Sequence, residues 1–102
     1  MEEKRKKLRN AYIDILFRMA GMHEKRGRHQ AACDCYIKII QVDQLLEAAY
    51  QRLMAVYVNC GMNSAVLRVY HDCQQVLRKK LNTKPDLKTT AIYRKIMDAP
   101  DH

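Results

Sequence analysis

Two cysteines and a histidine lie close together in residues 24–40, which have the sequence EKRGRHQAACDCYIKII. The thiolates of Cys33 and Cys35 and the imidazole of His29 are groups that bind zinc or carry redox chemistry. A zinc site, however, uses cysteine pairs such as CxxC together with a second pair of ligands. On a helix, Cys33 and Cys35 point about 200° apart and cannot easily share one metal ion. We therefore expect buried structural thiols at both positions rather than a metal or redox centre.

The composition indicates one small helical domain. The chain has 102 residues, of which 48% are hydrophobic and 29% are charged, with only 3 glycines and 2 prolines. A chain of this length can bury one hydrophobic core. The scarcity of glycine and proline favours helices. The remaining cysteines, Cys60 and Cys73, are expected to be buried structural thiols as well.

Several classes of protein are excluded by missing motifs. The chain has no phosphate-binding glycine loop and no HExxH or GxSxG motif, so we expect no enzyme activity and no cofactor. No apolar run is long enough to span a membrane. The charged N-terminus, MEEKRKKLRN, does not resemble a secretory signal. We therefore expect a cytoplasmic location, where thiols stay reduced.

Apolar residues recur at steps of three and four residues in five segments, which predicts five amphipathic helices. The apolar face of the first helix consists of Leu8, Tyr12, Ile15, Leu16, Met19, Met22 and His23. Gly61 is expected to end the third helix. Asn63 or Ser64 should cap the fourth helix, and Asp86 should cap the fifth.

Two windows of the chain repeat one pattern. Residues 19–36 align with residues 53–70, and this alignment pairs Gly27 with Gly61 and Tyr36 with Tyr70. The spacing of both pairs matches the tetratricopeptide repeat, a helix–turn–helix unit of about 34 residues. The sequence therefore predicts an all-α fold of antiparallel helical hairpins, arranged as a tetratricopeptide-like right-handed array of about five helices.

The expected domain organisation follows from this period. We expect one domain over residues 1–102, with hairpins at about 9–41 and 45–81 and a capping helix at about 86–97. Repeats bury little surface alone, because they stack on neighbouring repeats or caps. The predicted capping helix covers the C-terminal end of the array, whereas the N-terminal side can stay open.

The motifs of residues 9–97 resemble a known family. They include QVDQLLEAAYQRLM at residues 41–54, the pattern LRVYxxCxxxLRKKLN that follows Gly61, and a final helix that ends in YRKI. Nearly the whole chain resembles the bacterial transcriptional activator domain of antibiotic-regulatory (SARP-type) and related regulators. Lys79 and Lys80 stand where that family often has acidic residues, which makes this surface more basic.

The resemblance implies a regulatory domain for protein interaction and oligomerisation in a bacterial transcriptional activator. The winged-helix DNA-binding domain of such a regulator would lie upstream and is not expected in this chain. The implied partners are the transcription machinery or another domain of the same regulator. A further alternative is a second copy of the chain, which would form a homodimer. DNA would be reached indirectly, and no membrane contact is expected.

Helical phase suggests where a partner would bind. We expect a concave groove lined by the first helix of each hairpin. Candidate groove residues are Asp14, Phe17, Gly21, Lys25, Ala48, Gln51, Ala55 and Asn59.

Two alternative functions remain open. The net charge of +8 is compatible with nucleic-acid binding through phosphate contacts that do not depend on base sequence. Candidate basic residues are Arg5, Lys6, Lys7, Arg9, Arg78, Lys79, Lys80, Lys84 and Lys88. The other alternative is a generic peptide-binding repeat adaptor that is unrelated to transcription.

Overall fold

The computed structural model describes residues 2–98, and these form five α-helices and no strand. The helices are α1 (Glu2–Lys25), α2 (His29–Val42), α3 (Glu47–Asn59), α4 (Asn63–Leu81) and α5 (Leu87–Met97). The predicted all-α helical array is confirmed. The first helix begins well before residue 9, where the first hairpin was expected to start. Residues 1 and 99–102 of the expected domain lie outside the described residues.

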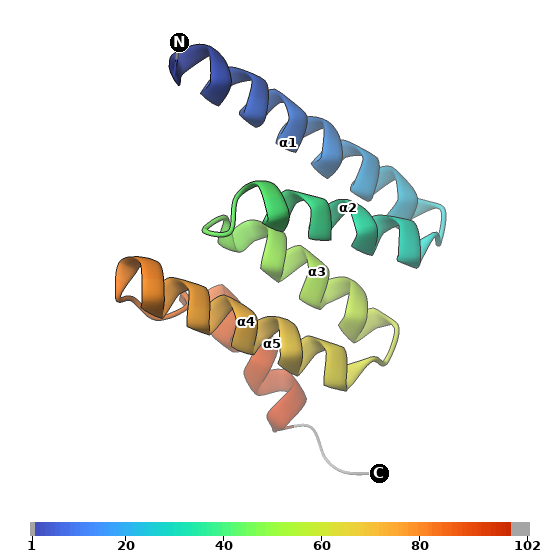
Figure 1. The fold of residues 1–102 in the computed structure, drawn as a ribbon. Coiled ribbons are helices and arrows are strands. Elements are labelled where there is room, and N and C mark those ends of the chain that lie inside the picture. The colour runs from blue at the N-terminus through green and yellow to red at the C-terminus, as the bar shows by residue number, and fades with distance from the viewer. Residues whose placement is uncertain (1, 99–102) are drawn as a thin grey trace.

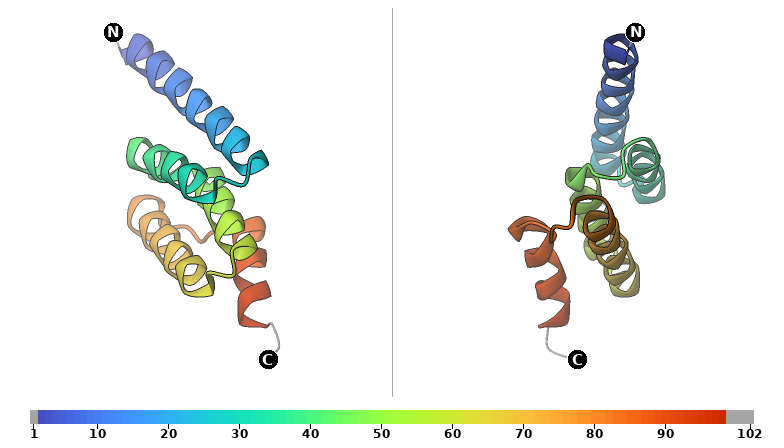
Figure 2. Two further views of the ribbon diagram at one scale, coloured as in Figure 1. Left: turned by 90° about the vertical axis from the view of Figure 1, so that its right-hand side faces the viewer. Right: turned by 60° about the vertical axis from the view of Figure 1, so that its left-hand side comes forward.

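The helices stack in chain order to form a flat array with extents of 54 × 37 × 17 Å. Figure 1 shows α1 and α2 as one antiparallel hairpin and α3 and α4 as the next. α2 contacts α3, and α5 contacts both α3 and α4. The N-terminal half of α1 projects beyond the rest of the array (Figure 2). α5 therefore covers one end of the stack, while α1 forms the other end.

Both hairpins turn through the same backbone motif. Gly27 and Gly61 each have a φ of 71°, which lies in the left-handed region that glycine adopts without strain. After the first turn, the Arg28 N–H donates to the His23 carbonyl at 2.8 Å, and the equivalent bond after the second turn is 2.9 Å. These are the long hydrogen bonds of the Schellman motif. The repeated turn confirms the predicted helix end at Gly61 and fixes the two hairpins in equivalent geometry.

The N-caps of α4 and α5 differ from one another. Met62 is the N-cap of α4 and its side chain makes no capping hydrogen bond, so the prediction of Asn63 or Ser64 as the cap is wrong. The Schellman turn leaves only Met62 between Gly61 and the first residue of α4. Asp86 does cap α5 as predicted, because its carboxylate accepts the Thr89 N–H at 3.1 Å.

The core is built from equivalent positions of the two hairpins. Ala32 and Val66 are fully buried where the helices of each hairpin approach each other. Tyr36 is also buried, and its hydroxyl donates to the Glu24 carboxylate. At the C-terminal end, the ring of Tyr70 stacks on Tyr93 of α5 with centroids 4.1 Å apart. Aromatic stacking of this kind stabilises the contact between α4 and α5 beyond simple area burial.

Three of the four cysteines are buried and one is exposed. Cys33 and Cys35 on α2 and Cys73 on α4 belong to the core, and all four are free thiols. Burial raises the pKa of the Cys73 thiol to about 12 and also raises the pKa of Cys33 and Cys35. These three are neutral packing groups near pH 7. The expectation of a buried thiol is wrong for Cys60, which is the C-cap of α3 and is exposed.

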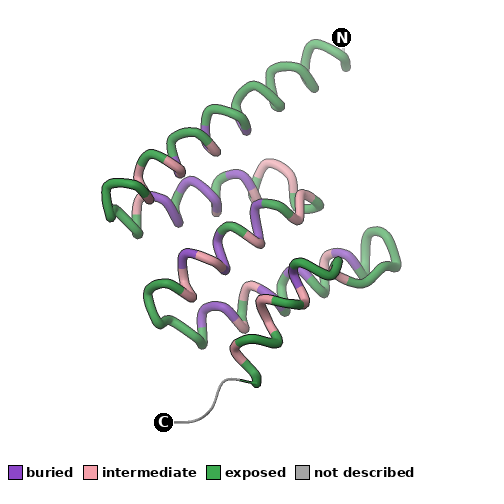
Figure 3. The backbone as a smooth tube through the Cα atoms, turned by 180° about the vertical axis from the view of Figure 1, so that it is seen from behind, coloured by how far each residue is buried: buried purple, intermediate pink, exposed green. Residues whose placement is uncertain are grey.

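The apolar face of α1 is only partly used for packing. The residues of α1 that are buried are Ile13, Leu16 and Ala20, which lie against α2. Five of the apolar residues predicted from the sequence are instead exposed. Their exposed fractions are 72% for Leu8, 46% for Tyr12, 54% for Ile15, 43% for Met19 and 52% for Met22. Figure 3 shows the first half of α1 as largely exposed. Among the described residues, α2 is the one helix that packs closely on α1, and it covers a neighbouring face.

A polar network ties α5 to α3. Thr89 is fully buried, and its hydroxyl donates to the Glu47 carboxylate at 2.8 Å and accepts from the Gln51 amide at 3.0 Å. Gln51 also donates to the Asp86 carboxylate at 3.1 Å, and the Asp86 N–H donates to Glu47 at 3.0 Å. Only Thr89 is fully buried in this network, and a buried hydroxyl stabilises the structure only while it has hydrogen-bond partners. The network therefore fixes the position of α5 on α3.

Replacing Thr89 with valine tests whether this network holds α5 on α3. Thr89→Val keeps the shape of the side chain but leaves Glu47 and Gln51 without one hydrogen-bond partner, so the free energy of unfolding should fall by about 1–3 kcal/mol. Urea denaturation of the purified chain measures this loss. Thr90→Val is the matched control, because the Thr90 hydroxyl bonds only to the Asp86 carbonyl at an exposed position. The control should change stability by no more than about 0.5 kcal/mol. Equal losses in the two variants would show that the network does not hold α5.

Candidate functional site

The side chains that first suggested chemistry are not assembled into a metal site. In residues 2–98, no group of three or more His, Cys, Asp and Glu side chains is placed to hold a metal ion. Cys33 and Cys35 are buried within α2, whereas His29 is exposed at its first residue. The same part of the chain contains no helix that is both long and apolar enough to cross a membrane.

The predicted groove residues fall into two groups. Asp14, Lys25 and Asn59 are exposed. Phe17 is partly buried and packs on Tyr36 with ring centroids 6.0 Å apart. The other predicted groove residues are partly buried (Gly21, Gln51 and Ala55) or exposed (Ala48).

These positions define what each predicted groove residue can do. Phe17 and Gln51 already have partners within the fold, the first on α2 and the second on α5. Using either side chain to bind a partner would cost its internal contact. The groove assignment stays a prediction, and Asp14, Lys25 and Asn59 are its accessible part.

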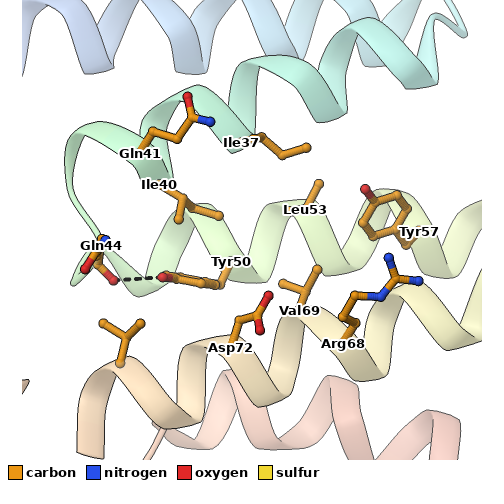
Figure 4. A pocket seen from close by; sticks show the side chains of 11 residues that line it. Ile37, Ile40, Gln41, Gln44, Tyr50, Leu53, Tyr57, Arg68, Val69 and Asp72 are labelled. Carbon is orange, nitrogen blue, oxygen red and sulfur yellow. Dashed lines mark hydrogen bonds between the residues drawn. The ribbon is translucent and has the colours of Figure 1, made fainter. Parts of the chain in front are cut away.

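A pocket of about 380 Å³ opens between α2, α3 and α4 (Figure 4). Its floor is apolar, with Ile40, Leu53 and Val69 among the lining side chains, while Arg68 and Asp72 line it from α4. The Tyr50 hydroxyl closes one end by donating to the Gln44 carbonyl at 2.9 Å. The volume suits one or two side chains of a partner rather than a large cofactor. This pocket was not predicted from the sequence, because its lining residues come from three helices.

The two aromatic residues of the pocket are neutral near pH 7. Burial, with further contributions from the nearby acidic groups of Cys73, Asp72 and Asp43, raises the pKa of Tyr50 to about 12. Burial also raises the pKa of Tyr57, and the neighbouring Arg68 acts in the opposite direction. Both hydroxyls therefore serve as hydrogen-bonding groups and not as ionised groups.

Part of the predicted basic surface is assembled at the C-terminal end of α4. Arg78, Lys79 and Lys84 line two neighbouring hollows together with Gln74, Gln75, Asn82 and Thr83. Lys80 is exposed but does not line either hollow. Asn82 has a φ of 51° and turns the chain after α4, which brings Lys84 back toward Arg78. The basic residues near the N-terminus lie at the far end of α1, where Arg5, Lys6 and Arg9 share a hollow with Glu2.

The largest group of exposed apolar side chains lies on α1. We call Leu8, Tyr12, Ile15, Met19 and Met22 the α1 stripe. Their alternating spacing of four and three residues places them on one face of the helix. Within residues 2–98, the other exposed large apolar residues are Leu45, Met62, Leu81, Leu87 and Met97, which are spread over the loops and ends of the other helices. Single exposed apolar residues are ordinary on a protein surface, whereas the five residues of the α1 stripe form one continuous row.

Cations border the α1 stripe. By helical phase, Lys7, Arg18 and Lys25 lie in one row along the side that faces away from α2, and none of them is buried. Asp14 is the one carboxylate in that row, and the opposite border is the face that packs on α2. The stripe is therefore an apolar strip with a positively charged edge.

Comparison with known proteins gives the family of the chain. The family model of the bacterial transcriptional activator domain matches residues 1–97. Nothing matches among curated proteins, and nothing matches among solved structures. The matched range covers all five helices, including the α1 stripe and the basic end of α4. The chain therefore belongs to the bacterial transcriptional activator domain family.

Proposed function

We propose that this chain is a protein-interaction domain of a cytoplasmic transcriptional activator. In this proposal it is a binding module and not an enzyme. It contacts the transcription machinery through the α1 stripe. DNA is contacted by another domain of the regulator. The observation that carries the proposal is the exposure of five large apolar side chains in one row on α1. Family membership supports the link to transcription.

The physical basis is the cost of leaving this row in water. Fully burying a side chain of the size of Leu, Ile or Met contributes about 1.5–3 kcal/mol to binding relative to leaving it exposed. The residues of the α1 stripe are about half exposed, so each of them can contribute about 1 kcal/mol when a partner covers it. Five such residues in one row make an apolar contact strong enough to anchor a partner. The cations beside the row then contribute to orientation and association rate.

The proposal can be tested by tethering the chain to an unrelated DNA-binding domain upstream of a reporter promoter in bacteria. The wild-type fusion should raise transcription. Ile15→Gln combined with Met19→Gln should remove most of this effect, because losing two buried apolar contacts costs about 2 kcal/mol, or roughly thirtyfold in affinity. Stability should change little, since both side chains are already about half exposed.

A matched control separates the stripe from exposed apolar residues in general. Met62→Gln with Met97→Gln alters two side chains that are exposed to the same degree but lie elsewhere. This variant should activate like the wild type. If the wild-type fusion does not activate, or if both double variants activate equally well, the proposed function of the stripe is wrong.

A second candidate function is nucleic-acid binding without sequence preference. The observation in its favour is the gathering of Arg78, Lys79 and Lys84 at one end of α4. Three phosphate contacts make the affinity fall steeply with salt, with a slope of about −2.7 in a plot of log K against log salt. Such binding would be weak at physiological salt.

Fluorescence anisotropy of a random DNA duplex distinguishes the two functions. The interaction-domain proposal predicts that any binding at low salt disappears at physiological salt. The variant Arg78→Gln, Lys79→Gln, Lys84→Gln should abolish the low-salt binding, whereas Lys88→Gln, Arg94→Gln, Lys95→Gln on α5 removes the same charge and should reduce it less. Tight binding by the wild type at physiological salt would instead favour direct contact with DNA.

A further inference from the structure

The sequence repeat relates the faces of α1 to the faces of α3. Leu16 and Ala20 lie against α2. A shift of one repeat, which takes Gly27 to Gly61, takes these two residues to Tyr50 and Met54. Tyr50 packs in a cluster with residues of α4, and Met54 packs in another cluster with residues of α4. The α1–α2 hairpin and the α3–α4 hairpin are therefore packed in the same way.

The same shift shows what the α1 stripe is equivalent to. Ile15, Met19 and Met22 correspond to Ala49, Leu53 and Val56 of α3. These three α3 residues are 0%, 3% and 1% exposed and belong to the core cluster that contains the buried residues of α2. In the second hairpin, this face of the first helix is thus covered by the preceding helix, α2. In the first hairpin, the equivalent face is bare.

The bare face is not a typical end of a repeat array. Terminal repeats normally present a polar outer face, because nothing stacks on them. Ile15, Met19 and Met22 instead keep large apolar side chains at these stacking positions, with exposed fractions between 43% and 54%. The fold thus provides a position for one more helix, packed on α1 as α2 is packed on α3.

We infer that the α1 stripe binds an amphipathic α-helix of a partner protein, whose own apolar row is bordered by aspartate or glutamate. This inference rests on the proposed function and specifies its partner. Repeat equivalence requires the occupant to be a helix. The stripe runs from Leu8 to Met22, so it spans about 21 Å and accommodates about four helical turns.

The charge of the occupant follows from the border of the stripe. A helix in the α2-like position would run beside Lys7, Arg18 and Lys25, none of which is buried. Acidic residues on that helix would form ion pairs at the rim of the contact, whereas basic residues would be repelled. Asp14 is the one carboxylate in this row.

The same border disfavours a second copy of the chain as the occupant. Two α1 helices packed through their stripes would bring the two rows of cations toward each other. In an antiparallel pair centred on Ile15, for example, Lys25 of each copy would lie near Lys7 of the other. Like charges opposed in this way weaken association.

A designed peptide tests the inference directly. The probe is a peptide of about three heptads with leucine at positions a and d and glutamate at e and g, and its control has lysine in place of every glutamate. The Glu peptide should bind the full chain at least about tenfold more tightly than the Lys peptide at low salt, because three rim pairs are gained. Isothermal titration calorimetry measures both affinities.

Three variants, one of them a control, assign the binding to the stripe and its border. Ile15→Gln with Met19→Gln should abolish binding of the Glu peptide, whereas Met62→Gln with Met97→Gln should leave it unchanged. Lys7→Glu, Arg18→Glu, Lys25→Glu should reverse the preference between the two peptides. Equal affinity for both peptides, or binding that survives Ile15→Gln with Met19→Gln, would overturn the inference.

Other occupants would give different results. If a second copy of the chain occupies the stripe, the chain should sediment as a dimer without peptide. The Ile15→Gln, Met19→Gln variant should then sediment as a monomer. If a membrane surface occupies the stripe, the chain should float with phosphatidylglycerol vesicles, and the Ile15→Gln, Met19→Gln variant should not. Either result would overturn the assignment to an acidic helix.

The outcome is separable from that of the proposed function. A tethered chain that activates transcription through the stripe but shows no preference for the Glu peptide would support the proposed function and contradict the inference about the acidic helix. A chain that selects the Glu peptide but does not activate transcription when tethered would support the inference and contradict the proposed function.

Discussion

A helix inside a stacked array must bury apolar side chains on two sides, and this requirement shapes the whole chain. α3 meets it fully, because α2 covers one side and α4 covers the other. α1 meets it on one side only, through Ile13, Leu16 and Ala20. The opposite end of the array avoids this problem, because α5 closes it with the stacked pair Tyr70–Tyr93 and with the buried hydroxyl of Thr89. The two ends of one repeat array are thus built differently, with one closed and one open.

The equivalence of the hairpins depends on their turns. Gly27 and Gly61 adopt the same left-handed conformation, and each turn is followed by the same long backbone hydrogen bond. Replacing either glycine with another residue would strain the backbone at positive φ. Because the turns are the same, the faces of α1 and α3 can be compared residue by residue at the shift that relates the two glycines. This comparison places Ile15, Met19 and Met22 of the α1 stripe at positions whose equivalents on α3 pack in the core.

Much of the fold could be predicted from the sequence, because local signals carry it. The apolar period gives five helices, the sequence repeat gives the hairpins, and the position of Asp86 gives the cap of α5. The sequence allowed an open N-terminal side but could not decide whether Ile15 and Met19 are exposed, because periodicity shows which face of a helix is apolar but not whether another helix covers it. The role of Gln51 was hidden for a similar reason, since its partners Asp86 and Thr89 come from a distant part of the chain.

The most direct test of this account measures how exposed the methionines of the free chain are. With 13C-labelled methionine methyl groups and a soluble paramagnetic agent, the NMR signals of Met19 and Met22 should broaden as strongly as that of Met62, since all three are about half exposed. Met54 lies on α3 against α4 and is 0% exposed, so its signal should stay sharp. If Met19 and Met22 are protected to the same degree as Met54, the stripe is already covered in the free chain. The account of α1 as an open stacking surface would then be wrong.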